Sequence, residues 1–206
     1  MTSTPWHAIV LAGDRASRLG GIDKTALRFE GMSLLERALA SVAGSQGTIV
    51  VGPEALRSRL PRGVALVTER PRFGGPAAAA VAGLRALDAE SGSRVALVAA
   101  DLPQAAAAMR ELLAVGALAD RVDGVVATDA AGNAQPLLAI YSTAALAAAA
   151  GRAEAVGPLA GTSMRALLTR LVLCHVRLPD ALCADIDTPE AAERHGIQLD
   201  LAPSYG

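Results

Sequence analysis

The sequence predicts a three-layer α/β fold, in which helices cover both faces of a mostly parallel β-sheet. Short runs rich in β-branched residues alternate with longer helical stretches through most of the 206 residues. Such alternation is typical of parallel strands joined by crossover helices. The runs at residues 124–128 and 137–141 are separated only by the turn-forming residues 129–133, which predicts a small antiparallel insertion.

The expected strands are short and spread along the chain. They lie at residues 8–11, 48–51, 64–67, 95–99, 124–128, 137–141 and 172–176. The run at residues 95–99 is strongly apolar, which predicts a central position in the sheet. Because no repeat, linker or domain boundary interrupts the pattern, we expect a single domain over residues 1–206.

Helices are expected between these strands, and several have recognisable ends. Ser33 and Glu36 have the spacing of a capping box, which predicts a helix to about residue 42. Pro53 is expected to start a short helix, and Pro76, after two glycines, a long Ala-rich one that ends near residue 88. Further helices are expected after residue 103, from residue 142, at residues 163–169, and from residue 188 with Thr as the cap.

The composition excludes several classes of protein. The net charge is -1 and no long run of like charge occurs, whereas proteins that bind nucleic acid usually carry a basic patch. No uncharged run of about 18 apolar residues occurs, so no membrane span is predicted. We recognise no signal peptide, and Cys174 and Cys183 form no C-x-x-C pair. We therefore expect a cytoplasmic protein with two buried thiols, no zinc site and no disulfide.

One lysine stands out among the basic residues. Lysines and arginines total 19, and Lys24 is the only lysine. Because an ammonium is a compact point charge, the remaining lysine is a candidate for a site that needs one, with chance as the alternative. Lys24 ends a glycine-rich segment, residues 11–24, which also contains Arg15 and Arg18. Such a segment can bind phosphates through backbone N–H groups and arginine forks, or can be a structural turn with solvated arginines.

Carboxylates lie at two further positions of interest. Asp101 follows the predicted central strand, at the edge of the sheet where ligands bind in α/β folds. Asp185 and Asp187 alternate on a segment that we expect to be a short strand, which would place both on one face. Since Mg²⁺ prefers one or two carboxylates plus phosphate oxygens, one of this pair would complete a magnesium site with Asp101. The alternative is that these groups cap helices.

Together these three segments resemble the MobA-type nucleotidyltransferases, which are the molybdenum cofactor guanylyltransferases and their close relatives. The resemblance spans roughly residues 7–196 and rests on the loop at 11–24, the Asp101-Leu102-Pro103 segment and the late Asp-x-Asp-Thr-Pro-Glu segment. It implies a Rossmann-like fold of the GT-A type. It also implies that the protein uses Mg²⁺ to transfer GMP from GTP to the terminal phosphate of molybdopterin, with release of pyrophosphate. Proteins that deliver or accept the cofactor are implied as partners.

The resemblance also implies which residues act on the phosphates. Asp101 would ligate Mg²⁺, and Asp187 would be the second metal position. Arg18 and Lys24 would neutralise the charge on the α-phosphate and the leaving pyrophosphate. Arg18, Lys24 and Asp101 are therefore the expected catalytic residues. No general base is expected, because the attacking phosphate oxygen is already ionised, and His7, His175 and His195 fall in no motif.

Further positions that match the family would bind the two substrates. Gln135 and Arg165 would face the acceptor. Glu69 would accept hydrogen bonds from N1 and N2 of guanine. The residues expected to bind the nucleotide are Leu11, Ala12, Gly13, Arg15, Lys24, Glu69, Gly75 and Asp101.

Asp14 departs from the pattern of the family, which usually has Gly-Gly where this chain has Gly13-Asp14. The carboxylate adds negative charge where a triphosphate would approach. We therefore expect Asp14→Gly to tighten nucleotide binding, and a catalytically silent nucleotide-binding protein is one alternative. A relative that uses CTP or a sugar phosphate is another. A dehydrogenase is disfavoured, because the dinucleotide-binding glycine pattern is absent.

Overall fold

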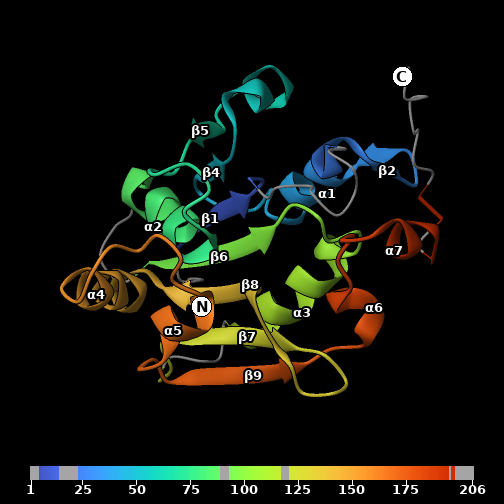
Figure 1. Ribbon diagram of the computed structural model, residues 1–206. Helices are drawn as coiled ribbons and strands as arrows, with labels where there is room; N and C mark the ends of the chain where they lie inside the picture. The colour runs from blue at the N-terminus through green and yellow to red at the C-terminus, as the bar shows by residue number, and fades with distance from the viewer. Residues whose placement is uncertain (1–4, 14–22, 89–92, 117–120, 195, 198–206) are drawn as a thin grey trace.

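The computed structural model describes residues 5–13, 23–88, 93–116, 121–194 and 196–197. Within these ranges seven strands form one sheet, in the order β5-β4-β1-β6-β8-β7-β9 (Figure 1). Neighbouring strands are parallel except at β8, which is antiparallel to both β6 and β7. The strands are β1 (Trp6–Leu11), β4 (Thr48–Val51), β5 (Ala65–Val67), β6 (Arg94–Ala99), β7 (Gly124–Thr128), β8 (Ala134–Ser142) and β9 (Leu173–Arg177). The mostly parallel sheet with an antiparallel insertion is thus confirmed.

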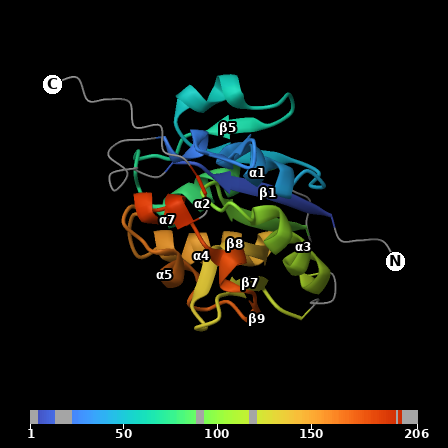
Figure 2. The same ribbon diagram turned by 90° about the vertical axis from the view of Figure 1, so that its right-hand side faces the viewer.

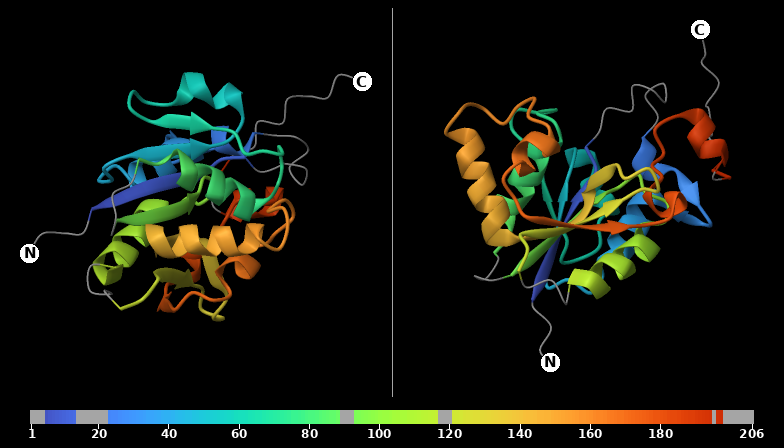
Figure 3. Two further views of the ribbon diagram at one scale, coloured as in Figure 1. Left: turned by 90° about the vertical axis from the view of Figure 1, so that its left-hand side faces the viewer. Right: turned by 90° about the horizontal axis from the view of Figure 1, so that it is seen from below.

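Helices cover both faces of this sheet, as the view from below in Figure 3 shows. One face carries α1 (Leu34–Ser41), α3 (Ala105–Gly116) and α6 (Asp180–Cys183), and the other carries α2 (Pro76–Ala86), α4 (Thr143–Glu154) and α5 (Met164–Leu168). Successive residues of a strand point to opposite faces. In β1, Ala8 and Val10 accordingly pack in the core between the sheet and α1, α3 and α6. Ile9 packs in the core on the other face, under α2, α4 and α5.

The helix α2 packs directly on the sheet because its buried residues are small. A methyl group added at Gly83 would lie 2.6 Å from Cγ2 of Ile9 and 2.9 Å from Cγ2 of Val51. Alanine and glycine therefore let this helix approach β1 and β4 closely. The approach places the first residue of α2, Pro76, at the same edge of the sheet as the carboxyl ends of the parallel strands. Figure 2 views the molecule from this edge.

Two helix starts agree with the sequence. The hydroxyl of Ser33 accepts from the N–H of Glu36 at 3.2 Å, and the carboxylate of Glu36 accepts from the N–H of Ser33 at 2.7 Å. The capping box is thus formed. At α7 (Pro189–Arg194), Thr188 caps the helix by accepting from the N–H of Ala191 at 3.2 Å. No helix formed by the described residues has the length and apolarity needed to cross a membrane.

The structure differs from the predicted elements in four places. Residues 184–188 form no strand, although we expected one there. The helix expected from Pro53 is the 3₁₀ helix η3 (Glu54–Arg59), and Pro53 is its cap rather than its first residue. The one-turn helix α6 and the small hairpin of β2 (Arg28–Phe29) and β3 (Met32–Ser33) were not predicted. Strands of two residues are too short to produce an alternating pattern.

A third, smaller core lies apart from the two faces of the sheet. It joins the segment that follows the 3₁₀ helix η2 (Lys24–Ala26) to the last described part of the chain. Its members are Leu27, Leu34, Ile186, Ala192 and Ile197. This core therefore holds together segments that are more than a hundred residues apart in the sequence.

Candidate active site

Three carboxylates meet at the carboxyl edge of the sheet. Asp101 lies two residues after the end of β6, and Asp185 and Asp187 precede α7. One oxygen atom from each carboxylate lies within 4.8 Å of the other two. The residue between the last two, Ile186, is fully buried, and its N–H donates to the carbonyl of Asp101 at 3.0 Å. This anchor brings the two flanking carboxylates to Asp101 without the strand that we expected.

The ammonium of Lys24 lies against this cluster. Its Nζ donates to Oδ1 of Asp187 and lies 3.7 Å from Oδ2 of Asp101. The side chain of Lys24 is only 8% exposed. Lysine is rarely buried to this degree without a charged partner, and here the carboxylates are the partners. Three carboxylates and one ammonium leave an excess of two negative charges when all are ionised.

Burial, and after it the excess charge, alters the protonation of the cluster. Burial raises the pKa of Asp101 to about 6, an effect that the neighbouring Asp185 and Asp187 increase and Lys24 opposes. Burial, and then the adjacent carboxylate of Asp187, also raise the pKa of Asp185. A divalent cation would neutralise the cluster, and carboxylate oxygens are the ligands that Mg²⁺ and Mn²⁺ prefer. The described residues thus fit a hard divalent cation.

A cavity of about 520 Å³ extends from the carboxylates along the sheet edge. This volume is within the range of small-molecule sites, which is roughly 300–1,000 Å³. Its walls include Leu11 at the end of β1, Leu137 of β8 and the segment from Glu69 to the start of α2. The cavity therefore has the acidic cluster and several apolar side chains in its walls.

Glu69 and Phe73 also line this cavity. Glu69 is 6% exposed, and its Oε1 accepts from the N–H of Phe73 at 3.0 Å. Its other oxygen lies 3.8 Å from the position that a methyl group would take at Gly13, so the carboxylate lies beside the end of β1. Phe73 has a φ of +60° and leaves its ring 53% exposed at the cavity. A buried carboxylate and an exposed ring thus face the same space.

The structure brings most of the predicted nucleotide-binding and metal-binding residues together. Leu11, Gly13, Glu69, Gly75, Asp101 and Asp187 line the cavity. Lys24 reaches the cluster through Asp187 and Asp101. Ala12 is buried, and its N–H donates to the carbonyl of Val51 at 2.8 Å.

Other predicted residues lie elsewhere. Gln135, on β8, is partly buried and Arg165, on α5, is exposed, and neither lines the cavity. Asp14, Arg15 and Arg18 lie outside the described residues. The roles of these five residues, like those of the residues that line the cavity, stay predictions.

Sequence reasoning missed several residues of the cavity, among them Arg72 and Phe73. The guanidinium carbon of Arg72 lies 5.9 Å from the centre of the Phe73 ring. A signal was present, because the chain has only two phenylalanines and this one directly precedes Gly74-Gly75-Pro76. Aromatic residues are scarce here, so one outside the core is informative.

Comparison with known proteins places this geometry in a family. Residues 8–173 match the MobA-like NTP transferase domain. A protein of Acidiphilium cryptum (strain JF-5) named molybdenum cofactor guanylyltransferase is 33% identical over 99 residues. That alignment covers 47% of this chain and 50% of the relative, so the chain spans only half the length of that protein.

Several solved structures share the fold. The molybdopterin-guanine dinucleotide biosynthesis protein A of Archaeoglobus fulgidus has a TM-score of 0.67 at 23% identity, covering 92% of this chain and 96% of that one. The 2-C-methyl-D-erythritol 4-phosphate cytidylyltransferase of Thermus thermophilus has a TM-score of 0.67 at 16% identity, covering 94% and 97%. Rv0371C of Mycobacterium tuberculosis H37Rv, solved in complex with manganese, has a TM-score of 0.64 at 20% identity, covering 94% and 98%. The fold is thus the α/β nucleotidyltransferase fold, and the chain belongs to the MobA-like NTP transferase family.

Proposed function

We propose that this protein transfers GMP from GTP to the terminal phosphate of molybdopterin, with Mg²⁺ as the cofactor and pyrophosphate as the second product. The observation that carries the proposal is the cluster of Asp101, Asp185 and Asp187 with the ammonium of Lys24, at the end of a cavity of about 520 Å³. Membership of the MobA-like family and the name of the partial relative support the nucleotide and the acceptor.

The chamber lined by Glu69 and Phe73 suits a guanine base. The carboxylate of Glu69 is an acceptor only, and guanine offers two neighbouring donors, N1–H and N2–H₂. The exposed ring of Phe73 provides an apolar surface against which a base can stack, worth roughly 1–3 kcal/mol. A base in this chamber would direct its triphosphate towards Lys24 and the carboxylates.

The transfer itself needs positioning and charge stabilisation more than proton transfer. An oxygen of the acceptor phosphate forms a bond to the α-phosphorus of the nucleotide, and the bond from that phosphorus to the β-phosphate oxygen breaks. The electron pair leaves with pyrophosphate. The attacking oxygen is already ionised, so no side chain has to remove a proton.

Lys24 is placed to stabilise the phosphate charge. Its ammonium has three donors and contacts two carboxylates, so it can add a bond to a phosphate oxygen while it stays tied to Asp187. Asp101 and Asp187, with Asp185 beside them, would hold Mg²⁺. The bound ion would supply a fixed positive charge to the phosphate oxygens.

Pyrophosphate release tests the proposal. Purified protein with Mg²⁺ is given GTP, CTP, ATP or UTP, each with and without molybdopterin. We expect release with GTP only, dependent on the acceptor and abolished by Asp101→Asn. Asp88→Asn, which changes an exposed carboxylate at the end of α2, serves as the matched control.

Each other result contradicts a defined part of the proposal. Release with another nucleotide would overturn the assignment of GTP and leave the transferase. Release with GTP and a different phosphorylated acceptor would overturn molybdopterin. No release with any nucleotide from folded protein would contradict the transferase itself, and recovery in Asp14→Gly would then identify a silent homologue.

The cellular setting is part of the same proposal. We infer that the protein works in the cytoplasm beside proteins that deliver or accept the molybdenum cofactor. Cys174 and Cys183 are both free thiols, which agrees with a reducing compartment, although only Cys183 is buried as we expected and Cys174 is partly exposed. Molybdopterin-dependent capture of such partners from a lysate of the source organism would test this setting, and capture that does not depend on molybdopterin would contradict it.

A further inference from the structure

The turn that carries Lys24 is fixed from both sides of that residue. Asp23 caps the 3₁₀ helix η2, with its Oδ1 accepting from the N–H of Thr25 at 2.9 Å. Thr25 is buried at 7% exposure, as is Lys24 itself. The orientation of the ammonium therefore depends on how firmly Asp23 and Thr25 are held.

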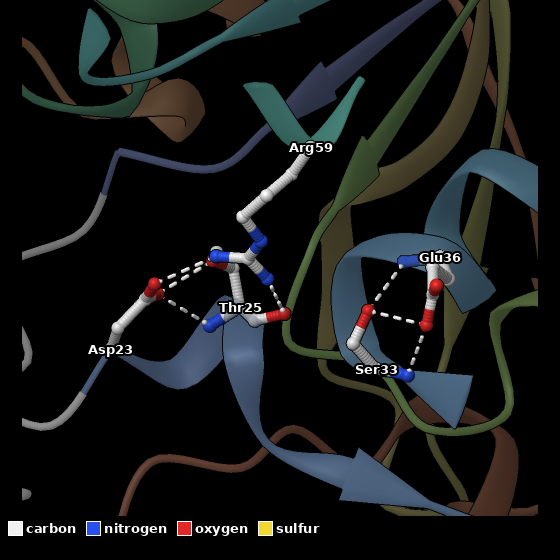
Figure 4. A network of polar contacts seen from close by, with 5 residues as sticks. All are labelled: Asp23, Thr25, Ser33, Glu36 and Arg59. Carbon is white, nitrogen blue, oxygen red and sulfur yellow. Dashed lines mark hydrogen bonds and ion pairs between the residues drawn. The ribbon is translucent and has the colours of Figure 1, made fainter. Parts of the chain in front are cut away.

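One arginine from a distant segment holds both of these neighbours. Nη1 of Arg59 donates to Oδ2 of Asp23 at 2.8 Å and to the hydroxyl of Thr25 at 3.0 Å. Nη2 donates to the carbonyl of Thr25 at 2.7 Å. Figure 4 shows the planar guanidinium between the two residues. A single rigid fork thus spans the residue before and the residue after Lys24.

Arg59 is itself attached to the carboxyl edge of the sheet. It is the last residue of η3, and Leu56 of the same helix is 3% exposed in the core below it. A methyl group at Gly52 would lie 2.9 Å from Cδ1 of Leu56 and 3.1 Å from the carbonyl oxygen of Ala12. The helix η3 is therefore packed tightly against the ends of β1 and β4. Arg59 thus fixes the turn relative to the sheet.

We propose that Arg59 is a positioning residue, which holds the Asp23–Thr25 turn so that the Lys24 ammonium faces the phosphates of the bound nucleotide. This role in phosphate binding rests on the function proposed above. The guanidinium also neutralises Asp23, whose carboxylate would otherwise compete with Asp187 and Asp101 for the ammonium next to it. A lysine at position 59 would keep the charge but lose the planar fork.

Arg57 provides a matched control on the same helix. It pairs with Glu54, three residues earlier, and both side chains are exposed. Arg57→Ala therefore removes one arginine and one ion pair from η3 without touching the turn. Any difference between Arg57→Ala and Arg59→Ala reports the contacts of Arg59 with Asp23 and Thr25.

The first readout does not depend on catalysis. Because Lys24 is the only lysine, protein labelled with ¹⁵N-lysine gives one side-chain ammonium signal. We expect Arg59→Ala to shift this signal and to speed the exchange of its protons by about tenfold. The reason is that a looser turn no longer holds the ammonium against Asp187 and Asp101. Arg57→Ala is expected to leave both properties as in the wild type.

The second readout is pyrophosphate release with the nucleotide that the wild type uses. We expect Arg59→Ala to lower kcat by about tenfold to a hundredfold, because displacement of a catalytic group by about 1 Å can cost that much. KM is expected to change less than kcat, since Asp23, Lys24 and Thr25 are not among the residues that line the cavity with Glu69 and Phe73. Arg59→Lys is expected to fall between Arg59→Ala and the wild type.

Opposite results would overturn the proposal. If Arg59→Ala gives the same ammonium signal, exchange rate and kcat as Arg57→Ala, Arg59 does not position Lys24. If Arg59→Ala does not fold, Arg59→Lys decides, and wild-type values for it would overturn the need for the fork. If the wild type releases no pyrophosphate, the proposed function fails, while the ammonium signal still tests Arg59.

Discussion

At the scale of single residues, the carboxylate of Asp101 is largely buried away from water. The pKa of this group is raised to about 6, chiefly by burial. Because folding raises the pKa of this carboxyl group, its ionised form is less stable in the folded protein than in the unfolded chain. The stability that it contributes is present below its unfolded pKa and is lost as the pH rises through about 6. Without a cation, Asp101 thus lowers the stability of the protein at neutral pH.

Replacement of this carboxylate should therefore stabilise the metal-free protein. We expect Asp101→Asn to raise the free energy of unfolding in EDTA near pH 7.5 by up to about 3 kcal/mol, which corresponds to a pKa difference between 3.8 and about 6. The gain should shrink between about pH 6 and pH 4, because the wild-type group becomes protonated there. Urea denaturation near pH 7.5 and near pH 4 measures the gain in stability. An equal gain at the two pH values would contradict the prediction.

Asp14 carries a second prediction for single residues. Its carboxylate belongs to the glycine-rich segment after β1, outside the described residues. We expect Asp14→Gly to tighten nucleotide binding, because it removes a negative charge from the segment that would approach the triphosphate. Calorimetric titration with a nucleoside triphosphate and Mg²⁺ measures the change. Equal or weaker affinity in the variant would disprove the repulsion.

Residues with local signals could be predicted from the sequence, and those with distant partners could not. Lys24 stood out by its rarity, and Asp101 by its place after an apolar strand. Arg59 had no such signal, because its partners lie 34 and 36 residues away and no spacing rule links them. Phe73 was missed because an aromatic residue in a sequence is most simply assigned to the core.

At the scale of elements, the prediction was best where the ends of an element are encoded locally. Most strands agree within a few residues, and Ser33 with Glu36 forms the expected capping box at α1. Residues 184–188 misled us because their alternation of Asp and Ile reflects a buried Ile186 and not a strand. One backbone bond to Asp101 and packing in the third core replace the ladder that a strand would have made.

The capping box allows a quantitative test at this scale. We expect Ser33→Ala to lower the free energy of unfolding by about 1 kcal/mol, the typical cost of losing a helix cap. Ser41→Ala, which removes a hydroxyl bonded to the carbonyl of Ala38 at the other end of α1, should cost less than half as much. Urea denaturation compares the two, and a larger effect for Ser41→Ala would refute the importance of the cap.

At the scale of the whole molecule, the third core connects the Lys24 turn to the segment that bears Asp185 and Asp187. Ile186 has no exposed surface, and it packs with Leu27 and Leu34 from the first part of the chain. Sequence patterns could predict the two large cores, because strands and helices show their buried faces. They could not predict this one, because Leu27, Ile186 and Ile197 lie outside helices and strands and meet the ends of two helices from opposite parts of the chain.

Truncation of Ile186 tests whether the third core supports the metal site. We expect Ile186→Ala to lower the free energy of unfolding by about 2–5 kcal/mol, as is usual for truncation of a buried isoleucine. It should also weaken Mn²⁺ binding, because both flanking carboxylates lose their anchor. Ile186→Val, with a loss of about 0.5–1.5 kcal/mol and nearly unchanged Mn²⁺ affinity, is the control. Unchanged Mn²⁺ affinity in folded Ile186→Ala would separate this core from the metal site.

The reversed direction of β8 has a consequence for divergence within the family. Because β8 runs against β6, its first residues start at the edge where Asp101 lies, and the turn at residues 129–133 stands beside them. Surface turns accept insertions and deletions without a change in strand register. This part of the edge can therefore evolve by lengthening one hairpin, while Lys24 and the carboxylates, carried by other segments, keep their geometry.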